Sequence, residues 1–177
     1  MSKMKHVSLI LTGLLGVSVG SLAMAQGATS ALKGHNADAP IDVSADRIEA
    51  QDRADRAIFS GNVKVRQAEL TLDTQRLTVA YTSGGGVQIR RLDASGGVVV
   101  RSPSETARGN FGIYDLDRKL ITLIGAVQLT RGGSQINGQR LTIDLNSGRA
   151  VVDGGAAGIG QSGGRVTGHF TVPKKGQ

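Results

Sequence analysis

A repeated stretch of sequence constrains this chain most. The segment GNVKVRQAELTLDTQRLT at residues 61–78 returns without a gap, 64 positions later, as GAVQLTRGGSQINGQRLT at residues 125–142. Both copies alternate apolar and polar residues, and on a β-strand successive side chains point to opposite faces of the sheet. A repeated unit with one apolar face predicts stacked or meandering strands around a continuous apolar interior.

The same pattern fills residues 57–152. Short alternating runs of Val, Ile, Leu and Thr are separated by Gly, Asp or Asn, and no long window has the period of a helix. Glycine recurs at strand junctions, at Gly61, Gly97, Gly125 and Gly154, where it usually marks a bend or bulge. The units between these glycines are longer than one coil of a typical parallel β-helix. We therefore predict an all-β fold of repeated antiparallel hairpins folded across one another.

The N-terminus has the layout of a secretory signal peptide. A basic head with Lys3 and Lys5 precedes an apolar run, and Ala23-Met24-Ala25 is a small-residue cleavage motif. The run is shorter than the roughly 20 apolar residues of a membrane-spanning helix, which argues against an uncleaved anchor. We expect a signal peptide at residues 1–25, a disordered leader at 26–39, one folded domain at 40–173 and a basic tail at 174–177.

The chain is basic and lacks cysteine. Its formal net charge of +7 fits either simple solubility or attraction to an anionic glycolipid or membrane surface. Nucleic acid is not expected as a partner, because the chain is exported and has no Trp, two Tyr and three Phe for base stacking. Disulfides and thiol chemistry are excluded.

Patterns for catalysis or metal binding are scarce. The histidines stand far apart in the sequence, at His6, His35 and His169. None has a companion at metal-ligand spacing. The carboxylate pairs Asp52/Asp55 and Asp115/Asp117 are explained best as turn formers and second as calcium ligands. The Gly-rich residues 154–164 fit neither a dinucleotide-binding nor a phosphate-loop motif. We therefore expect no enzyme, no metal and no cofactor.

The apolar face of the strands remains as the candidate site. It is either a closed core or the lining of a partly open roll that accepts acyl chains, because alternation alone does not distinguish the two. Aliphatic linings suit fatty chains, whose burial contributes about 0.8 kcal/mol per methylene. The candidate residues are Val63, Val65, Leu70, Leu72, Leu77, Val79, Val98, Val100, Phe111, Ile113, Val127, Leu129, Ile136, Leu141 and Ile143.

Four stretches resemble the periplasmic lipopolysaccharide transport protein A family, also called the OstA-like family. They are APIDVS at residues 39–44, FSGNV at 59–63, LTVAY at 77–81 and RVTGHFTVP at 165–173. The resemblance implies a V-shaped, open antiparallel β-jelly roll in the periplasm. It implies a carrier without catalysis that stacks end to end into a bridge. Lipopolysaccharide would pass from an inner-membrane transporter to an outer-membrane translocon, with the acyl chains of lipid A inside the roll.

The resemblance also places the two ends of the roll. Ile41 and Val43 would lie on the N-terminal edge strand, facing the groove, at the end that meets the inner-membrane partner. The strand near residues 165–172 would meet the next subunit or the translocon.

Two other hypotheses stay open. One is a related β-roll module of the same pathway, either a membrane-tethered partner or a detached translocon domain. The other is a secreted β-solenoid enzyme that acts on glycans with Asp115 and Asp117. The basic residues Lys64, Arg66, Arg90 and Arg91 either face water or contact lipid phosphates and sugars.

Overall fold

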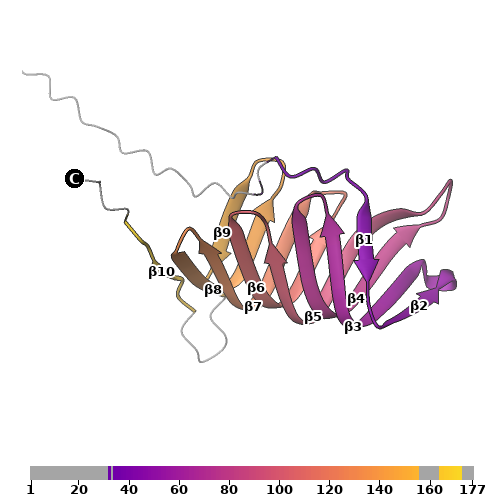
Figure 1. Ribbon diagram of the computed structural model, residues 1–177, viewed down its shortest axis with the longest axis horizontal. Coiled ribbons are helices and arrows are strands. Elements are labelled where there is room, and N and C mark those ends of the chain that lie inside the picture. The colour runs from indigo at the N-terminus through magenta and orange to yellow at the C-terminus, as the bar shows by residue number, and fades with distance from the viewer. Residues whose placement is uncertain (1–31, 33, 156–163, 173–177) are drawn as a thin grey trace, which may run out of the picture.

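The computed structural model describes Leu32, residues 34–155 and residues 164–172 (Figure 1). Within these residues, ten strands form a single antiparallel sheet, and a 3-10 helix, η1 (Asp52–Ala54), follows the second strand. The strands are β1 (Ile41–Ser44), β2 (Arg47–Gln51), β3 (Arg56–Gln67), β4 (Leu70–Thr82), β5 (Gln88–Arg101), β6 (Glu105–Asp115), β7 (Leu120–Arg131), β8 (Ser134–Asp144), β9 (Arg149–Asp153) and β10 (Thr167–His169). The predicted signal peptide and basic tail lie outside the described residues.

The sheet is a meander with two composite edges. Its order is β1-β3-β4-β5-β6-β7-β8-β10, with β2 also paired to β3 and β9 also paired to β8. At one end, β1 and β2 pair with the two halves of β3. At the other end, β10 and β9 do the same for β8. The two edges do not pair with each other, so the predicted open, antiparallel all-β roll is confirmed.

Each long strand bends at one shared line across the sheet, and the β4/β5 pair has a second register shift between Ala80 and Tyr81. Two-residue bulges in β3, β5 and β7 lie opposite single residues in β4, β6 and β8. The bulges are Gly61-Asn62, Gly96-Gly97 and Gly125-Ala126, and the single residues are Gln75, Asn110 and Gln139. We call this line of bends the corner. It divides the sheet into a first arm, in front in Figure 1, and a second arm behind it.

The corner explains the spacing of the glycines. All six bulge residues have a positive φ, a conformation that glycine adopts without steric cost. A Cβ atom on Gly96 would lie 2.8 Å from Cβ of Gln75, and one on Gly125 would lie 2.8 Å from Nδ2 of Asn110. The bends predicted at Gly61, Gly97 and Gly125 are confirmed. Beyond β9, a Cβ atom on Gly155 would lie 3.2 Å from Cβ of Gln139, in the equivalent place.

The strands are longer than the sequence predicts. Residues 70–72 and 76–81, which the alternation divides into two short runs, both belong to β4, because the interruption between them is the bend at Gln75. A bend interrupts the alternation of a strand in the same way that a turn does. The hydrogen-bonded ladder continues on both sides of it.

The expected disordered leader is wrong for residues 34–39, and the folded part begins before Pro40. His35 is buried, and the backbone turns through hydrogen bonds from His35 N to Leu32 O and from Ala37 N to His35 O, both 3.0 Å. Leu32 is buried as well. These residues pass along the open side of the roll (Figure 1).

Candidate functional site

The inner faces of the two arms form one aliphatic surface. Matched positions of the sequence repeat lie at its centre: Leu77 and Leu141 are 0% exposed, and Val63 and Val127 are 1% exposed. Tyr114 is the one aromatic residue among the fully buried apolar residues that the structure describes. Most candidate lining residues are buried here: Val63, Val65, Leu70, Leu72, Leu77, Val79, Val98, Val100, Val127, Leu141 and Ile143. Ile41, Val43 and Leu129 are partly buried against this cluster, and Ile136 is half-buried opposite Leu129.

Strand register arranges these side chains in apolar rows that cross the whole sheet. Directly paired residues on one face of a sheet are close neighbours. The first-arm row is Val43, Val65, Leu72, Val100, Ala107, Leu129, Ile136 and Gly168. The second arm has a row nearest the corner, with Ile48, Phe59, Leu77, Ala94, Gly112, Leu123, Leu141 and Val152. Its outer row is Ala50, Ala57, Val79, Leu92, Tyr114, Ile121, Ile143 and Ala150.

Two candidate residues, Phe111 and Ile113, do not belong to the inner face. Phe111 is 54% exposed on the outside of β6, and Ile113 shares its orientation. The reason is the bend at Asn110, where two consecutive residues point outward and the alternation changes phase. Gly112 then takes the inward position. This position has no space for a larger side chain, because a Cβ atom on Gly112 would already lie 3.0 Å from Cγ1 of Val98.

Several inner residues are absent from the candidate set. They are Leu92, Ala94, Ala107, Tyr114, Ile121, Leu123 and Leu145. Alternation within residues 120–124 identifies Ile121 and Leu123 as one face. It does not say which face is inside.

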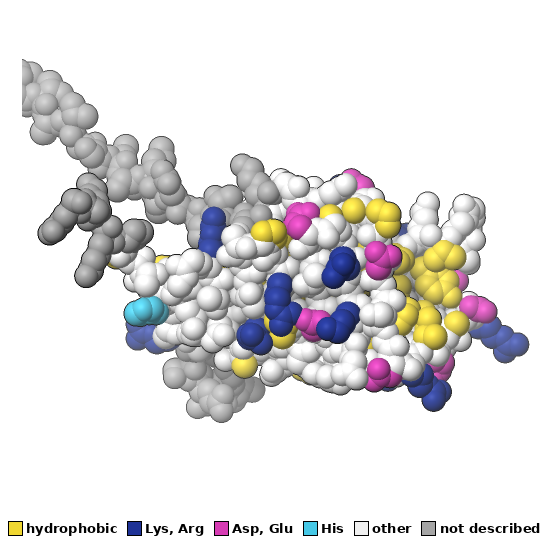
Figure 2. Space-filling view, viewed as in Figure 1, with side chains coloured by type: hydrophobic (Ala, Val, Ile, Leu, Met, Phe, Trp, Pro, Cys, Tyr) yellow, Lys and Arg dark blue, Asp and Glu magenta, His cyan; other side chains and the backbone are white. Residues whose placement is uncertain are grey.

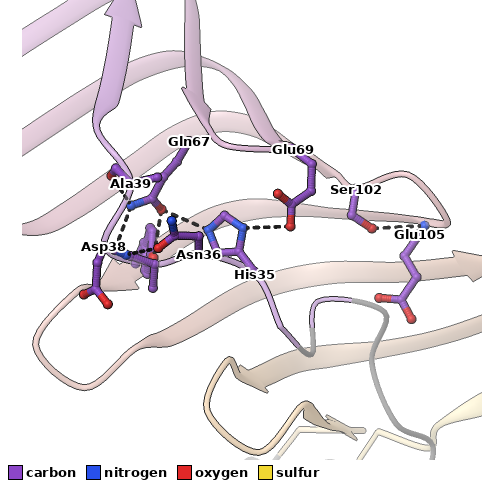
Figure 3. A network of polar contacts seen from close by, with 10 residues as sticks. His35, Asn36, Asp38, Ala39, Gln67, Glu69, Ser102 and Glu105 are labelled. Atoms are coloured by element: carbon purple, nitrogen blue, oxygen red, sulfur yellow. Dashed lines mark hydrogen bonds and ion pairs between the residues drawn. The ribbon is translucent and has the colours of Figure 1, made fainter.

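A polar cluster lies at the mouth between the arms (Figure 3). The His35 ring contacts Oε1 of Glu69 at 3.3 Å through Nδ1 and Oε1 of Gln67 at 3.1 Å through Nε2. The Tyr114 hydroxyl donates to Oε1 of Gln67 at 3.0 Å, and Nε2 of Gln67 donates to the carbonyl oxygen of Ala37 at 2.9 Å. Burial raises the pKa of Tyr114 to about 12. A backbone hydrogen bond, helped by His35, holds the pKa of Glu69 below its ordinary value.

The outer face carries interspersed charges. Figure 2 shows Lys and Arg side chains beside Asp and Glu side chains on the front of the molecule. Arg101 pairs with Asp73, and Lys64 lies 3.9 Å from the same carboxylate. Such exposed pairs contribute little to stability.

Arg66 also lies on the first arm, in β3 opposite Thr71, and the candidates Arg90, Arg91, Asp115 and Asp117 belong to the second arm. Arg91 bonds Asp93 at 2.9 Å, and Arg90 pairs with Asp117. Asp115 accepts a hydrogen bond of 2.9 Å from the backbone N–H of Arg118, as a turn-forming residue does. The two carboxylates proposed for glycan chemistry thus lie in an exposed hairpin tip and are engaged with arginines.

Within the described part of the chain, no three or more His, Cys, Asp or Glu side chains gather as a metal site. A search of the same residues finds no helix with the length and apolar character needed to cross a membrane.

Comparisons with known proteins agree with this geometry. A family model described as LptA/(LptD N-terminal domain) LPS transport protein matches residues 42–149. Uncharacterized protein R00383 of Rhizobium meliloti (strain 1021) is 34% identical over 155 residues, which are 82% of this chain and 83% of that protein. The crystal structure of LptH from Pseudomonas aeruginosa, titled as the LptA homologous periplasmic component of the conserved lipopolysaccharide transport device, is similar in fold. The TM-score is 0.66 at 19% identity, over 78% of this chain and 99% of that chain.

The fold and its inner face therefore define an open antiparallel β-jelly roll with an aliphatic interior. The chain belongs to the family of LptA and the LptD N-terminal domain, which are lipopolysaccharide transport proteins. The predicted family is confirmed. It is a family of transport proteins and not of enzymes.

Proposed function

We propose that this protein is a periplasmic carrier of lipopolysaccharide that holds the acyl chains of lipid A against the inner faces of its two arms. In this proposal, copies stack end to end between an inner-membrane transporter and an outer-membrane translocon. The carrier does no chemistry, and the upstream transporter supplies the energy for movement.

The continuity of the apolar rows carries the proposal. Each row runs from the β1/β2 edge to the β9/β10 edge without a charged residue. Aliphatic surface of this kind favours acyl chains through the hydrophobic effect, which is not directional. An acyl chain can therefore move along the rows without breaking a specific bond at each step.

The two ends support stacking. Ile48, at the start of one row, is 61% exposed at the end of the molecule where Figure 2 shows hydrophobic side chains gathered. At the opposite end, Phe170 is 66% exposed beyond β10. Each end also presents edge strands, and edge strands join sheets by main-chain pairing. Stacking of this kind would connect the rows of successive copies.

Site-specific photo-crosslinking in cells tests lipid binding. A benzophenone amino acid replaces Val43, Val65 or Leu129 on the first-arm row, with Lys64 and Phe111 as outward-facing controls. We expect lipopolysaccharide adducts at the three inner positions and none at the controls. Adducts at none of the five positions, with the protein exported and folded, would show that the interior is a sealed core.

A further inference from the structure

The mouth of the roll is crossed by a segment that belongs to neither arm. Leu32 and residues 34–39, which we call the strap, pass between the hairpin tips of the two arms (Figure 1). Several of its backbone–backbone hydrogen bonds join residues within the strap, such as that from Ala39 N to Asn36 O at 3.2 Å. Because the strap adds no strand to the sheet, it can leave the mouth without breaking a ladder.

Leu32 inserts an aliphatic side chain between the arms. It lies beside Val100 and Leu129 of the first-arm row and Ile143 of the second arm, and it is 3% exposed. The space left beside these side chains is about 10 Å³, barely enough for one water molecule. A methylene chain and Leu32 therefore cannot occupy this place together.

The strap is held partly by exposed ion pairs and partly by buried contacts. Nζ of Lys119 contacts Oδ2 of Asp38 at 3.1 Å, where the aspartate side chain is 80% exposed. The Glu69 side chain, which pairs with His35, is 45% exposed. Exposed pairs contribute little stability. The buried and half-buried part of the strap's attachment is Leu32, the His35 contact with Gln67, and the hydrogen bonds that Nε2 of Gln67 donates to the carbonyl oxygens of Ala37 and Ala39.

We infer that the Leu32 position is a binding site for an acyl chain, occupied by the protein's own strap until lipid displaces it. The inference rests on the proposed lipid-carrier function. The site already holds an aliphatic group, contacts both arms and lies directly on the first-arm row. The strap thus competes with lipid for the mouth of the roll.

A covalent pin on the strap tests the inference. The chain contains no cysteine, so Asp38→Cys with Lys119→Cys gives two unique labelling sites whose native side chains touch. A short bis-maleimide bridges the sites, and the same variant capped with two single maleimides is the matched control. The probe is lipopolysaccharide carrying a fluorophore on its sugar, and the readout is its Kd for the purified exported protein.

We expect the bridge to raise the Kd at least about tenfold, because lipid binding requires the strap to leave the mouth and the bridge prevents this movement. Equal Kd values for bridged and capped protein would overturn the strap inference and leave the carrier function standing. Absence of binding by the wild-type, bridged and capped proteins alike would contradict both the strap inference and the lipid-carrier function.

Truncation of the competing side chain gives a second, independent measurement. Leu32→Ala should lower the Kd several-fold. The strap then binds less tightly in the mouth, so a larger fraction of the protein has the mouth open to lipid. Val87→Ala is the control, since Val87 is an exposed aliphatic residue between β4 and β5 that belongs to none of the apolar rows. A Leu32→Ala protein that folds and binds no more tightly than wild type would contradict the inference.

Discussion

Among single residues, Tyr114 makes stability depend on pH. It is 4% exposed, its hydroxyl donates to Gln67, and burial raises its pKa to about 12. In the unfolded chain the phenol ionises near its ordinary pKa of about 10. The folded state therefore favours the neutral phenol. This contribution is fully present below pH 10 and is lost as the pH rises from about 10 to 12.

We expect the free energy of unfolding to fall by about 2 kcal/mol across that window in wild type. The fall should be much smaller in Tyr114→Phe. Urea unfolding at a series of pH values measures it. Tyr81→Phe is the control, because Tyr81 lies at the surface near Asp52, and this variant should keep most of the decline. A decline of equal size in Tyr114→Phe would contradict the assignment.

Residue patterns predicted most of the inner face and failed at the bends. In β4 and β8, the corner residue is followed by an outward arginine and an inward leucine, as in Gln75-Arg76-Leu77. In β6 the same positions read Asn110-Phe111-Gly112. Hydrophobicity alone predicts that the Phe111 side chain faces the interior of the roll. Only the cross-strand neighbours reveal that Val98 and Leu123 already fill the space at Gly112.

The packing of the strap could not be predicted from residue patterns either, for a different reason. Residues 26–39 are small and polar, with no period to indicate structure. Leu32 and His35 are fixed by contacts with residues more than thirty positions later, such as Gln67 and Glu69. Isolated residues of this kind give no local signal, because their order comes entirely from tertiary packing.

At the scale of the strand, the corner separates two effects of glycine. Gly96 and Gly97 are adjacent in β5 and have nearly equal φ angles of +87° and +86°. A Cβ atom on Gly96 would meet Gln75, whereas one on Gly97 would have no atom within 4 Å. Both alanine substitutions therefore bring backbone strain, and only Gly96→Ala also brings a clash.

We expect Gly97→Ala to lower the free energy of unfolding by about 1 kcal/mol and Gly96→Ala by about 1–3 kcal/mol more. Chemical denaturation of the two variants measures the difference. Combining Gly96→Ala with Gln75→Gly removes the contacting Cβ atom and should abolish the excess. Equal losses in the two single variants would show that the corner depends on φ alone.

At the scale of the whole molecule, the sheet has two open edges of different composition. The β1/β2 edge exposes Ile48, and the β9/β10 edge is followed by exposed Phe170. Unlike edges on opposite ends suit the head-to-tail contact of the proposed stacking, and such a contact extends into a filament unless its rotation closes a ring. The meander itself followed from the sequence repeat. The exposure of the residues at its ends could not be predicted from the repeat, because apolar and polar residues alternate in the same way in an edge strand and in a central strand.

Charged substitutions at the ends distinguish the proposed stacking from other association. Ile48→Arg and Phe170→Arg should each shift self-association to at least tenfold higher protein concentration, because a buried unpaired charge opposes the contact. Phe111→Arg is the matched control: Phe111 is equally apolar and 54% exposed, but it lies on the outer face away from both edges. Sedimentation velocity over a concentration series measures the effect. If Phe111→Arg dissociates the protein and the two end variants do not, copies associate through the outer face, and the apolar rows of neighbouring copies are not continuous.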